Sequence, residues 1–123
     1  MPSVIVADDE VFVRDFLKNL LASIHFDVIA EVERGDVLPF IIAEKKPDIL
    51  LLDINMPNLT GIEFLKLYRK NFPDTCIIIL TSPALQSLAD EAVLAGADCF
   101  LKKDTPVDKI IATIKQTWEN FKK

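Results

Sequence analysis

The chain has 123 residues, half of them hydrophobic, which is enough for one sizeable core and too little for two. We therefore expect residues 1–123 to form a single domain. With 19 acidic and 14 basic side chains, the net charge is -5. This charge argues against direct nucleic-acid binding, in which Lys and Arg neutralise phosphates. The high apolar content also excludes intrinsic disorder.

Several further classes of protein are excluded by what the chain does not contain. Its three glycines are too scattered to build a glycine-rich phosphate loop. Its apolar runs are far shorter than a membrane span, and the amino terminus has no secretory pattern. We therefore expect a cytoplasmic protein without membrane contact. Cys76 and Cys99 are then expected to be reduced and buried, and the lone His25 to face solvent in a loop.

Five short apolar segments, partly β-branched, predict five strands. In chain order these are residues 3–8, 28–32, 49–53, 76–81 and 99–101. Three of the segments are continuously hydrophobic, a pattern typical of parallel strands that are buried on both faces of a sheet.

Longer stretches with helical spacing separate the predicted strands. The first stretch places five apolar residues on one side, namely Val13, Phe16, Leu17, Leu20 and Ile24. The last stretch does the same with Val107, Ile110, Ile111, Ile114, Trp118 and Phe121. For this last helix we predict Thr105 as the N-cap, Pro106 as the first helical residue and Asp108 as a capping-box-like partner.

The predicted elements alternate strictly, five strands with five helices. Strict alternation indicates βαβ units with right-handed crossovers, in which helices cover both faces of one parallel sheet. We therefore predict a doubly wound α/β domain. Ligands of such sheets bind beyond the carboxyl ends of the strands, so the residues at those ends are the candidate site.

Polar side chains follow four of the five predicted strands. In chain order they are Asp8, Asp9 and Glu10, then Asp53, then Thr81 and Ser82, and finally Lys102 and Lys103. Clustered carboxylates repel one another unless a cation neutralises them, and oxygen ligands without His or Cys favour Mg2+. A hydroxyl and an ammonium suit the oxygens of a phosphoryl group, and an Asp carboxylate can itself be phosphorylated.

Each of these residues also has a plainer explanation. Asp8 and Asp9 could cap a helix, Asp53 could hold a turn, Thr81 could end a strand, and Lys103 could be an ordinary solvated lysine. The phosphoryl-site interpretation is favoured because chemically complementary groups fall together at the topologically preferred place.

The ordered set of motifs resembles a response-regulator receiver domain over residues 4 to about 121. The motifs are Asp8-Asp9, Asp53-Ile54-Asn55-Met56-Pro57 with Gly61, Thr81-Ser82, and Ala95-Gly96-Ala97-Asp98 with Lys103. The resemblance implies a flavodoxin-like (βα)5 fold with sheet order 2-1-3-4-5. It makes Asp53 the phosphoryl acceptor. It implies a Mg2+ site formed by Asp8, Asp9, Asp53 and the backbone carbonyl of Asn55, with Asp9 as a direct ligand and Asp8 acting nearby or through water.

The resemblance also implies roles for three residues around the phosphoryl group. Thr81 would hydrogen-bond it, Lys103 would pair with it, and Phe100 would reorient on activation, unless Phe100 is an ordinary core ring. The chain departs from many receivers in having Asp104 after the lysine, where they have proline. Pro83 replaces a longer polar side chain, and we expect it to alter phosphoryl lifetime or access.

As a receiver, the chain would be a signalling switch of a two-component system and not an enzyme, with at most slow self-phosphorylation from small donors and slow self-dephosphorylation. Its partners would be a sensor histidine kinase or phosphotransfer protein and an output protein or domain. The face of the fourth helix, fifth strand and fifth helix would change, with a phosphorylation-dependent homodimer as one outcome. The output alternatives are a stand-alone regulator and the receiver portion of a helix-turn-helix transcription factor, to which residues 101–106 are similar.

Three other functions compete with this interpretation. A phosphatase of the haloacid dehalogenase type would need a second acid two residues after Asp53, where this chain has Asn55. A receiver-like binding module that works without phosphate is disfavoured by the complete acidic site. A flavodoxin-type flavin protein is disfavoured because an acidic crevice repels the flavin phosphate.

Overall fold

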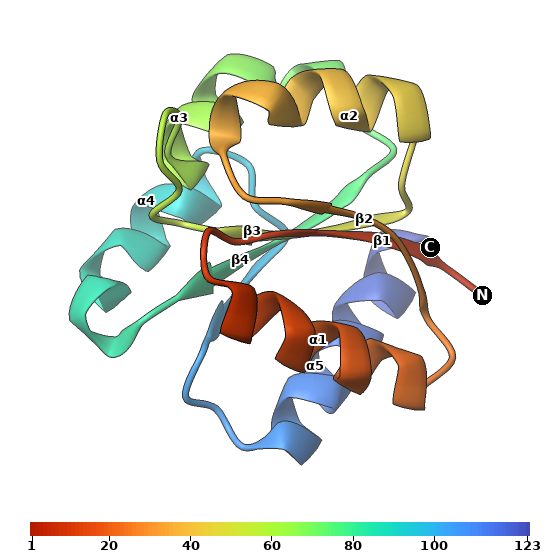
Figure 1. Ribbon diagram of the computed structural model, residues 1–123. Coiled ribbons are helices and arrows are strands. Elements are labelled where there is room, and N and C mark those ends of the chain that lie inside the picture. Colours follow the sequence, from red (N-terminus) through yellow and green to blue (C-terminus); the bar gives the residue numbers. More distant parts are fainter.

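A five-stranded parallel sheet lies between two layers of helices (Figure 1). The computed structural model describes the backbone of residues 1–123 and every side chain except that of Gln86. The strands are β1 (Ser3–Ala7), β2 (Asp27–Val32), β3 (Ile49–Asp53), β4 (Cys76–Thr81) and β5 (Cys99–Lys102). Their order is β2-β1-β3-β4-β5 and all neighbouring pairs are parallel, so the predicted fold and sheet order are confirmed.

The helices divide between the two faces of the sheet (Figure 1). One face is covered by α1 (Val11–Ser23) and α5 (Val107–Phe121). The other is covered by α2 (Leu38–Lys45), α3 (Gly61–Tyr68) and α4 (Ala89–Leu94). Short 3-10 turns precede α2, follow α3 and precede α4, over Gly35–Val37, Arg69–Asn71 and Pro83–Leu88.

The core consists of two clusters, one on each face of the sheet. Successive side chains of a strand point to opposite faces, so Leu50 and Leu52 join the α2, α3 and α4 cluster while Ile49 and Leu51 join the α1 and α5 cluster. Every residue of β3 and β4 is buried. Burial of each Leu or Ile contributes roughly 1.5–3 kcal/mol, which explains why the central strands are continuously apolar.

Two residues of the predicted apolar stripes are exposed instead. Phe16 is 36% exposed and Val107 is 48% exposed, whereas Arg14 and Leu21 are buried. Phe16 lies about 100° around the helix from the buried Leu17, at the margin of the stripe. Val107 is the first residue of α5, a turn before its packed residues begin.

The predicted start of the last helix is also wrong. Pro106 is the N-cap of α5, and no side chain caps the helix. The backbone N–H of Thr105 donates to the carbonyl of Lys102 at 3.1 Å, so Thr105 belongs to the preceding turn. A complete capping box stands at α3 instead, where Thr60 and Glu63 exchange side-chain to backbone hydrogen bonds of 3.2 and 2.9 Å.

Smaller predictions can be compared directly with the structure. Both cysteines are free; Cys76 is buried and Cys99 is half-buried, so only one of the two is a full core residue. His25 is exposed and has a left-handed backbone (φ 62°) just after α1, as expected of a loop residue. Within the described part of the chain, the helices are all too short or too polar to cross a lipid bilayer.

Candidate functional site

The carboxyl ends of four strands meet at one edge of the sheet and bring the predicted site residues together. Asp53 and Thr81 are the last residues of β3 and β4, and Asp8 and Lys103 follow β1 and β5 directly. Backbone hydrogen bonds fix the strand ends in register: Lys103 N–H donates to the carbonyl of Thr81 at 2.8 Å. The sheet therefore positions these four residues before any side-chain interaction forms.

Lys103 is the cation of the site. Its Nζ lies 2.8 Å from Asp8 Oδ2, 3.4 Å from Asp53 Oδ1 and 3.7 Å from Glu10 Oε1. Burial alone would lower the pKa of the Lys103 ammonium, but the adjoining carboxylates of Asp8 and Asp53 outweigh burial and raise it. Lys102 is the last residue of β5, one position short of the turn that aims Lys103 at the carboxylates.

Asp53 is a buried carboxyl group with a strongly perturbed pKa. It is only 4% exposed, and its Oδ1 accepts a hydrogen bond from the backbone N–H of Asn55 at 3.1 Å. Burial, and then the charge of Asp8, raise the pKa of Asp53 to about 6, although Asn55 and Lys103 pull in the other direction. A carboxyl group that is costly to ionise in this way is a candidate functional residue.

Asp8 offers a carboxylate oxygen that is ion-paired with Lys103 but takes part in no hydrogen bond with any residue that the structure describes. Asp8 is fully buried, and its Oδ1 accepts a hydrogen bond from the backbone N–H of Glu10 at 2.9 Å. Among the described residues, no donor gives Oδ2 a hydrogen bond; Lys103 Nζ approaches it closely but outside hydrogen-bond geometry. Asp8, Asp9 and Glu10 each offer a carboxylate oxygen, all within 4.8 Å of one another. An unsatisfied buried oxygen within an all-oxygen set fits a hard cation such as Mg2+.

A small pocket of about 150 Å³ opens at this edge of the sheet. It is lined by Asp9, Glu10, Asp53, Asn55, Ser82, Leu85 and Lys103. Pockets for larger organic ligands measure about 300–1,000 Å³, so this one suits a phosphoryl group or a hydrated ion.

Neither Thr81 nor Phe100 lines the pocket. The Thr81 side chain is fully buried, and its hydroxyl donates to the carbonyl of Ser82 at 3.2 Å. The next residue, Ser82, lines the pocket. The Phe100 ring is half-buried against the core cluster under α2, α3 and α4. Asn55 is exposed, and its backbone N–H faces Asp53.

The first residue of α3 supports Asp53 from behind. A Cβ on Gly61 would lie 2.9 Å from the carbonyl oxygen of Asp53 and 3.0 Å from the Cα of Ile54. Only glycine allows the helix to begin this close to the strand end. The Gly61 N–H donates to the carbonyl of Ile54 at 3.0 Å, which closes the loop.

Three residues near the site were given no role in the sequence predictions. Ser82 lines the pocket and Glu10 lies near Lys103, although each was recognised only as a neighbour of a predicted residue. Arg14 was missed altogether, although its Nη1 donates to the carbonyl of Asp8 at 2.7 Å. The available signal was a charged residue three positions before the buried Leu17, on the inward side of α1.

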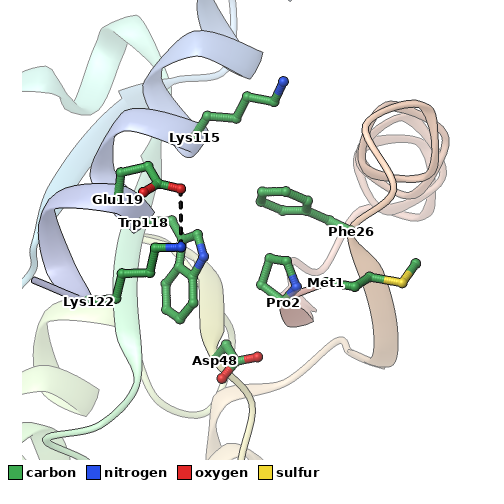
Figure 2. Close-up of a pocket in the computed structure, with 8 residues that line it drawn as sticks. All are labelled: Met1, Pro2, Phe26, Asp48, Lys115, Trp118, Glu119 and Lys122. Atoms are coloured by element: carbon green, nitrogen blue, oxygen red, sulfur yellow. Dashed lines mark ion pairs between the residues drawn. The ribbon is translucent and has the colours of Figure 1, made fainter.

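A larger hollow of about 470 Å³ lies at the opposite ends of the strands (Figure 2). Its lining residues are Met1, Pro2, Phe26, Asp48, Lys115, Trp118, Glu119 and Lys122. In Figure 2, Trp118, Glu119 and Lys122 of α5 face Pro2 and Phe26 across the opening. None of the predicted site residues lines this hollow, so size alone does not identify the functional site.

The geometry described above agrees with a comparison against known families. A family model described as the response regulator receiver domain matches residues 4–115. The chain belongs to this family. Receiver domains are phosphoacceptor switches of two-component systems, phosphorylated on Asp, and they bind Mg2+ at an acidic pocket. The predicted family is thereby confirmed, and the phosphatase and flavin-protein alternatives are set aside.

Relatives of two kinds resemble this receiver. The chemotaxis protein CheY of Bacillus subtilis is 32% identical over 114 residues, which cover 93% of this chain and 95% of CheY. The transcriptional regulatory protein YdfI of the same organism is 36% identical over 115 residues, 93% of this chain and 54% of YdfI. The chain thus spans about half the length of the transcriptional regulators YdfI and YhcZ.

Solved structures agree with the assignment. A DNA-binding response regulator of the LuxR family from Staphylococcus aureus superposes with a TM-score of 0.87 at 27% identity, covering 96% of this chain and 99% of that chain. The receiver domain of AraT from Geobacillus stearothermophilus has a TM-score of 0.87 at 25% identity, covering 98% of this chain and 95% of that chain.

Proposed function

We propose that this receiver accepts a phosphoryl group on Asp53 from the phosphohistidine of a sensor kinase or phosphotransfer protein. The observation that carries the proposal is the Lys103 ammonium 3.4 Å from the buried Asp53 carboxylate, in a pocket of phosphoryl size. The buried carboxylate is the nucleophile, and the ammonium is the positive charge that the product needs.

The transfer is a displacement at phosphorus. Asn55 N–H and Lys103 both engage Oδ1 of Asp53, which leaves Oδ2 to attack. The new O–P bond forms as the N–P bond of the phosphohistidine breaks, and its electron pair returns to the imidazole. The pocket holds the two reacting groups in line and restricts access of water.

Asp8, Asp9, Asp53 and the backbone carbonyl of Asn55 would hold Mg2+ in this site. When bound, Mg2+ neutralises the charge that gathers on the phosphoryl oxygens during transfer. The buried Oδ2 of Asp8 supports this assignment, because its only cationic partner among the residues described is Lys103, which also lies 3.4 Å from Asp53 and would be drawn toward the phosphoryl group.

Phosphorylation would act as a switch through the residues at the ends of β4 and β5. The phosphoryl group adds up to about two negative charges beside Lys103. The Thr81 hydroxyl, which donates to the carbonyl of Ser82 here, would turn toward a phosphoryl oxygen. Because Thr81 ends β4 and Lys103 follows β5, their movement would shift the α4, β5 and α5 face, including Phe100, between two packings.

The changed face would control a partner protein or an attached output domain in the cytoplasm. Full-length similarity to CheY supports a stand-alone regulator, and similarity to half of YdfI supports a transcription factor. A phosphorylation-dependent homodimer would use the same face. Sedimentation with and without the phosphoryl group tests the homodimer, because only dimerisation would double the mass of the particle.

The first test of the proposal is intact mass after incubation with acetyl phosphate, with and without Mg2+. The wild type should gain one phosphoryl group only with Mg2+, and Asp53→Ala should gain none. Asp104→Ala, which removes an exposed carboxylate beside Lys103, is the matched control. It should still gain one phosphoryl group, although we expect it to lose that group at a rate different from the wild type's. A phosphoryl group on Asp53→Ala would assign another acceptor. A wild type that neither acetyl phosphate nor a kinase labels would favour a module that binds its partner without phosphate.

A further inference from the structure

Arg14 is a buried cation on the inward side of α1. It is 9% exposed, although it lies in the first turn and a half of a surface helix. A buried charge destabilises the fold unless it is paired and its donors are used. The partners of Arg14 therefore show what holds it inside.

The Arg14 side chain contacts one group beside the acidic pocket and one on the edge strand β2. Its Nη1 donates to the carbonyl oxygen of Asp8 at 2.7 Å, and its Nε donates to Glu31 Oε1 at 3.1 Å. Glu31 stands near the end of β2 and also accepts from Lys18 at 2.9 Å. Arg14 thus connects β2 to the turn that follows β1.

The peptide group that joins Asp8 to Asp9 is restrained by this contact. The preceding peptide group is also held, because the Asp8 N–H donates to the carbonyl of Val32 in β2 at 2.9 Å. Asp8 is therefore held to β2 twice, once by a direct backbone bond and once through the guanidinium of Arg14. Because the carbonyl that Arg14 holds belongs to the Asp8–Asp9 peptide, this contact restrains the backbone from which both carboxylates project.

We propose that Arg14, oriented by Glu31, is a positioning residue for the Mg2+ site. The inference rests on the proposed function, since it assumes that Asp8 and Asp9 hold the metal. Neither Arg14 nor Glu31 would be a metal ligand; they would fix the loop that presents the ligands. Residues that orient metal ligands typically contribute about tenfold to a hundredfold in affinity when they are removed.

Replacing Arg14 would change the Mg2+ affinity in two opposite ways, through lost charge and through lost positioning. The two effects can therefore be measured separately. Removing a positive charge near a cation site strengthens cation binding, whereas loosening the ligand loop weakens it. Arg14→Lys keeps the charge and loses the planar pair of donors that reaches Asp8 and Glu31 together. This variant therefore measures positioning alone. Lys18→Arg is its matched control, since it also keeps the charge, four residues along the same helix and on the same Glu31.

The test is a Mg2+ titration of each full-length variant followed by NMR of the backbone amides of residues 8–10 and 55. Arg14→Lys should bind Mg2+ at least about threefold more weakly than the wild type, and Lys18→Arg within about twofold. Amide signals remote from the site report whether each variant is folded. Wild-type affinity in a folded Arg14→Lys would overturn the inference.

A second pair of variants keeps the proposal testable if Arg14→Lys does not fold. Glu31→Gln removes the carboxylate that orients Arg14, and Glu33→Gln removes an equal charge from the exposed turn after β2. Glu31→Gln should weaken Mg2+ binding more than Glu33→Gln, and equal effects would overturn the inference. A wild type that binds no Mg2+ would instead count against the proposed metal site itself.

Discussion

Asp53 is ionised against the preference of its surroundings. The native pKa of about 6 exceeds the unfolded value because burial and Asp8 disfavour the carboxylate. A raised carboxyl pKa means that the folded state binds the proton more tightly, so its stabilising contribution is complete below the unfolded pKa. That contribution is lost as pH rises through the native pKa, and near neutral pH the ionised Asp53 destabilises the metal-free fold.

We therefore expect Asp53→Asn to be more stable than the wild type near neutral pH when Mg2+ is absent. The gain in unfolding free energy should be about 3 kcal/mol, because raising the Asp53 pKa from its ordinary value of 3.8 to about 6 costs about 1.4 kcal/mol per pH unit. The gain should shrink toward zero below about pH 4, where the wild-type carboxyl is protonated in both states. Urea unfolding in a chelator at the two pH values measures it.

The control for this prediction is Asp104→Asn, which removes an exposed carboxylate near the same site. Its unfolding free energy should stay within about 0.5 kcal/mol of the wild type at both pH values. A stability gain for Asp53→Asn that is the same in acid and at neutral pH would mean that side-chain ionisation is not its cause.

At the scale of an element, the start of α3 is set by its capping box. Thr60 Oγ1 accepts from the backbone N–H of Glu63, and Glu63 Oε1 accepts from the backbone N–H of Thr60. Thr60→Ala leaves the backbone N–H of Glu63 without its side-chain partner, so the unfolding free energy should fall by about 1 kcal/mol. Chemical denaturation measures this loss.

Thr105→Ala provides the matched comparison. The sequence pattern before α5 predicts a cap at Thr105, but the structure has Pro106 at the N-cap with no capping side chain. Thr105→Ala should therefore change the unfolding free energy by no more than about 0.5 kcal/mol. If both threonine variants lose the same stability, the assignment of the two helix starts is wrong.

These two helix starts illustrate which parts of an element are readable from sequence. The strands β3 and β4 have the predicted bounds, each an apolar run plus the one polar residue after it, because burial on both faces demands continuous hydrophobicity. The spacing from threonine to an acid is the same, three residues, at Thr60 and at Thr105. Which threonine caps a helix depends on where the chain turns, and that turn is set by packing between distant segments.

At the scale of the molecule, the site follows from the order of the strands. Strand alternation predicted which residues stand at carboxyl ends, and the family resemblance supplied the order that brings β1, β3, β4 and β5 together. Arg14 could not be found in this way. An arginine in an apolar stripe is ordinarily a solvated residue, and only the packing of α1 against β2 reveals the Asp8 carbonyl and Glu31 as its partners.

We expect the same convergence to make the stability of the whole domain depend on Mg2+ and pH together. A cation held by Asp8, Asp9 and Asp53 would join the loops after β1 and β3, and the unfolded chain cannot offer that arrangement. Ligand binding to the folded state alone stabilises it by about 2.7 kcal/mol at a hundred times Kd. We therefore expect saturating Mg2+ to raise the Tm near neutral pH.

This Mg2+-dependent increase in Tm should diminish as the pH falls through about 6, because a proton on Asp53 then competes with the cation. Thermal unfolding in Mg2+ and in chelator, at neutral and at acidic pH, measures the increase. Asp53→Asn should show a smaller increase that varies less over the same pH range, since its amide does not titrate. An increase in wild-type Tm that is equal on both sides of this pH would place the cation away from Asp53. The cluster of Asp8, Asp9 and Glu10 would then supply the ligands.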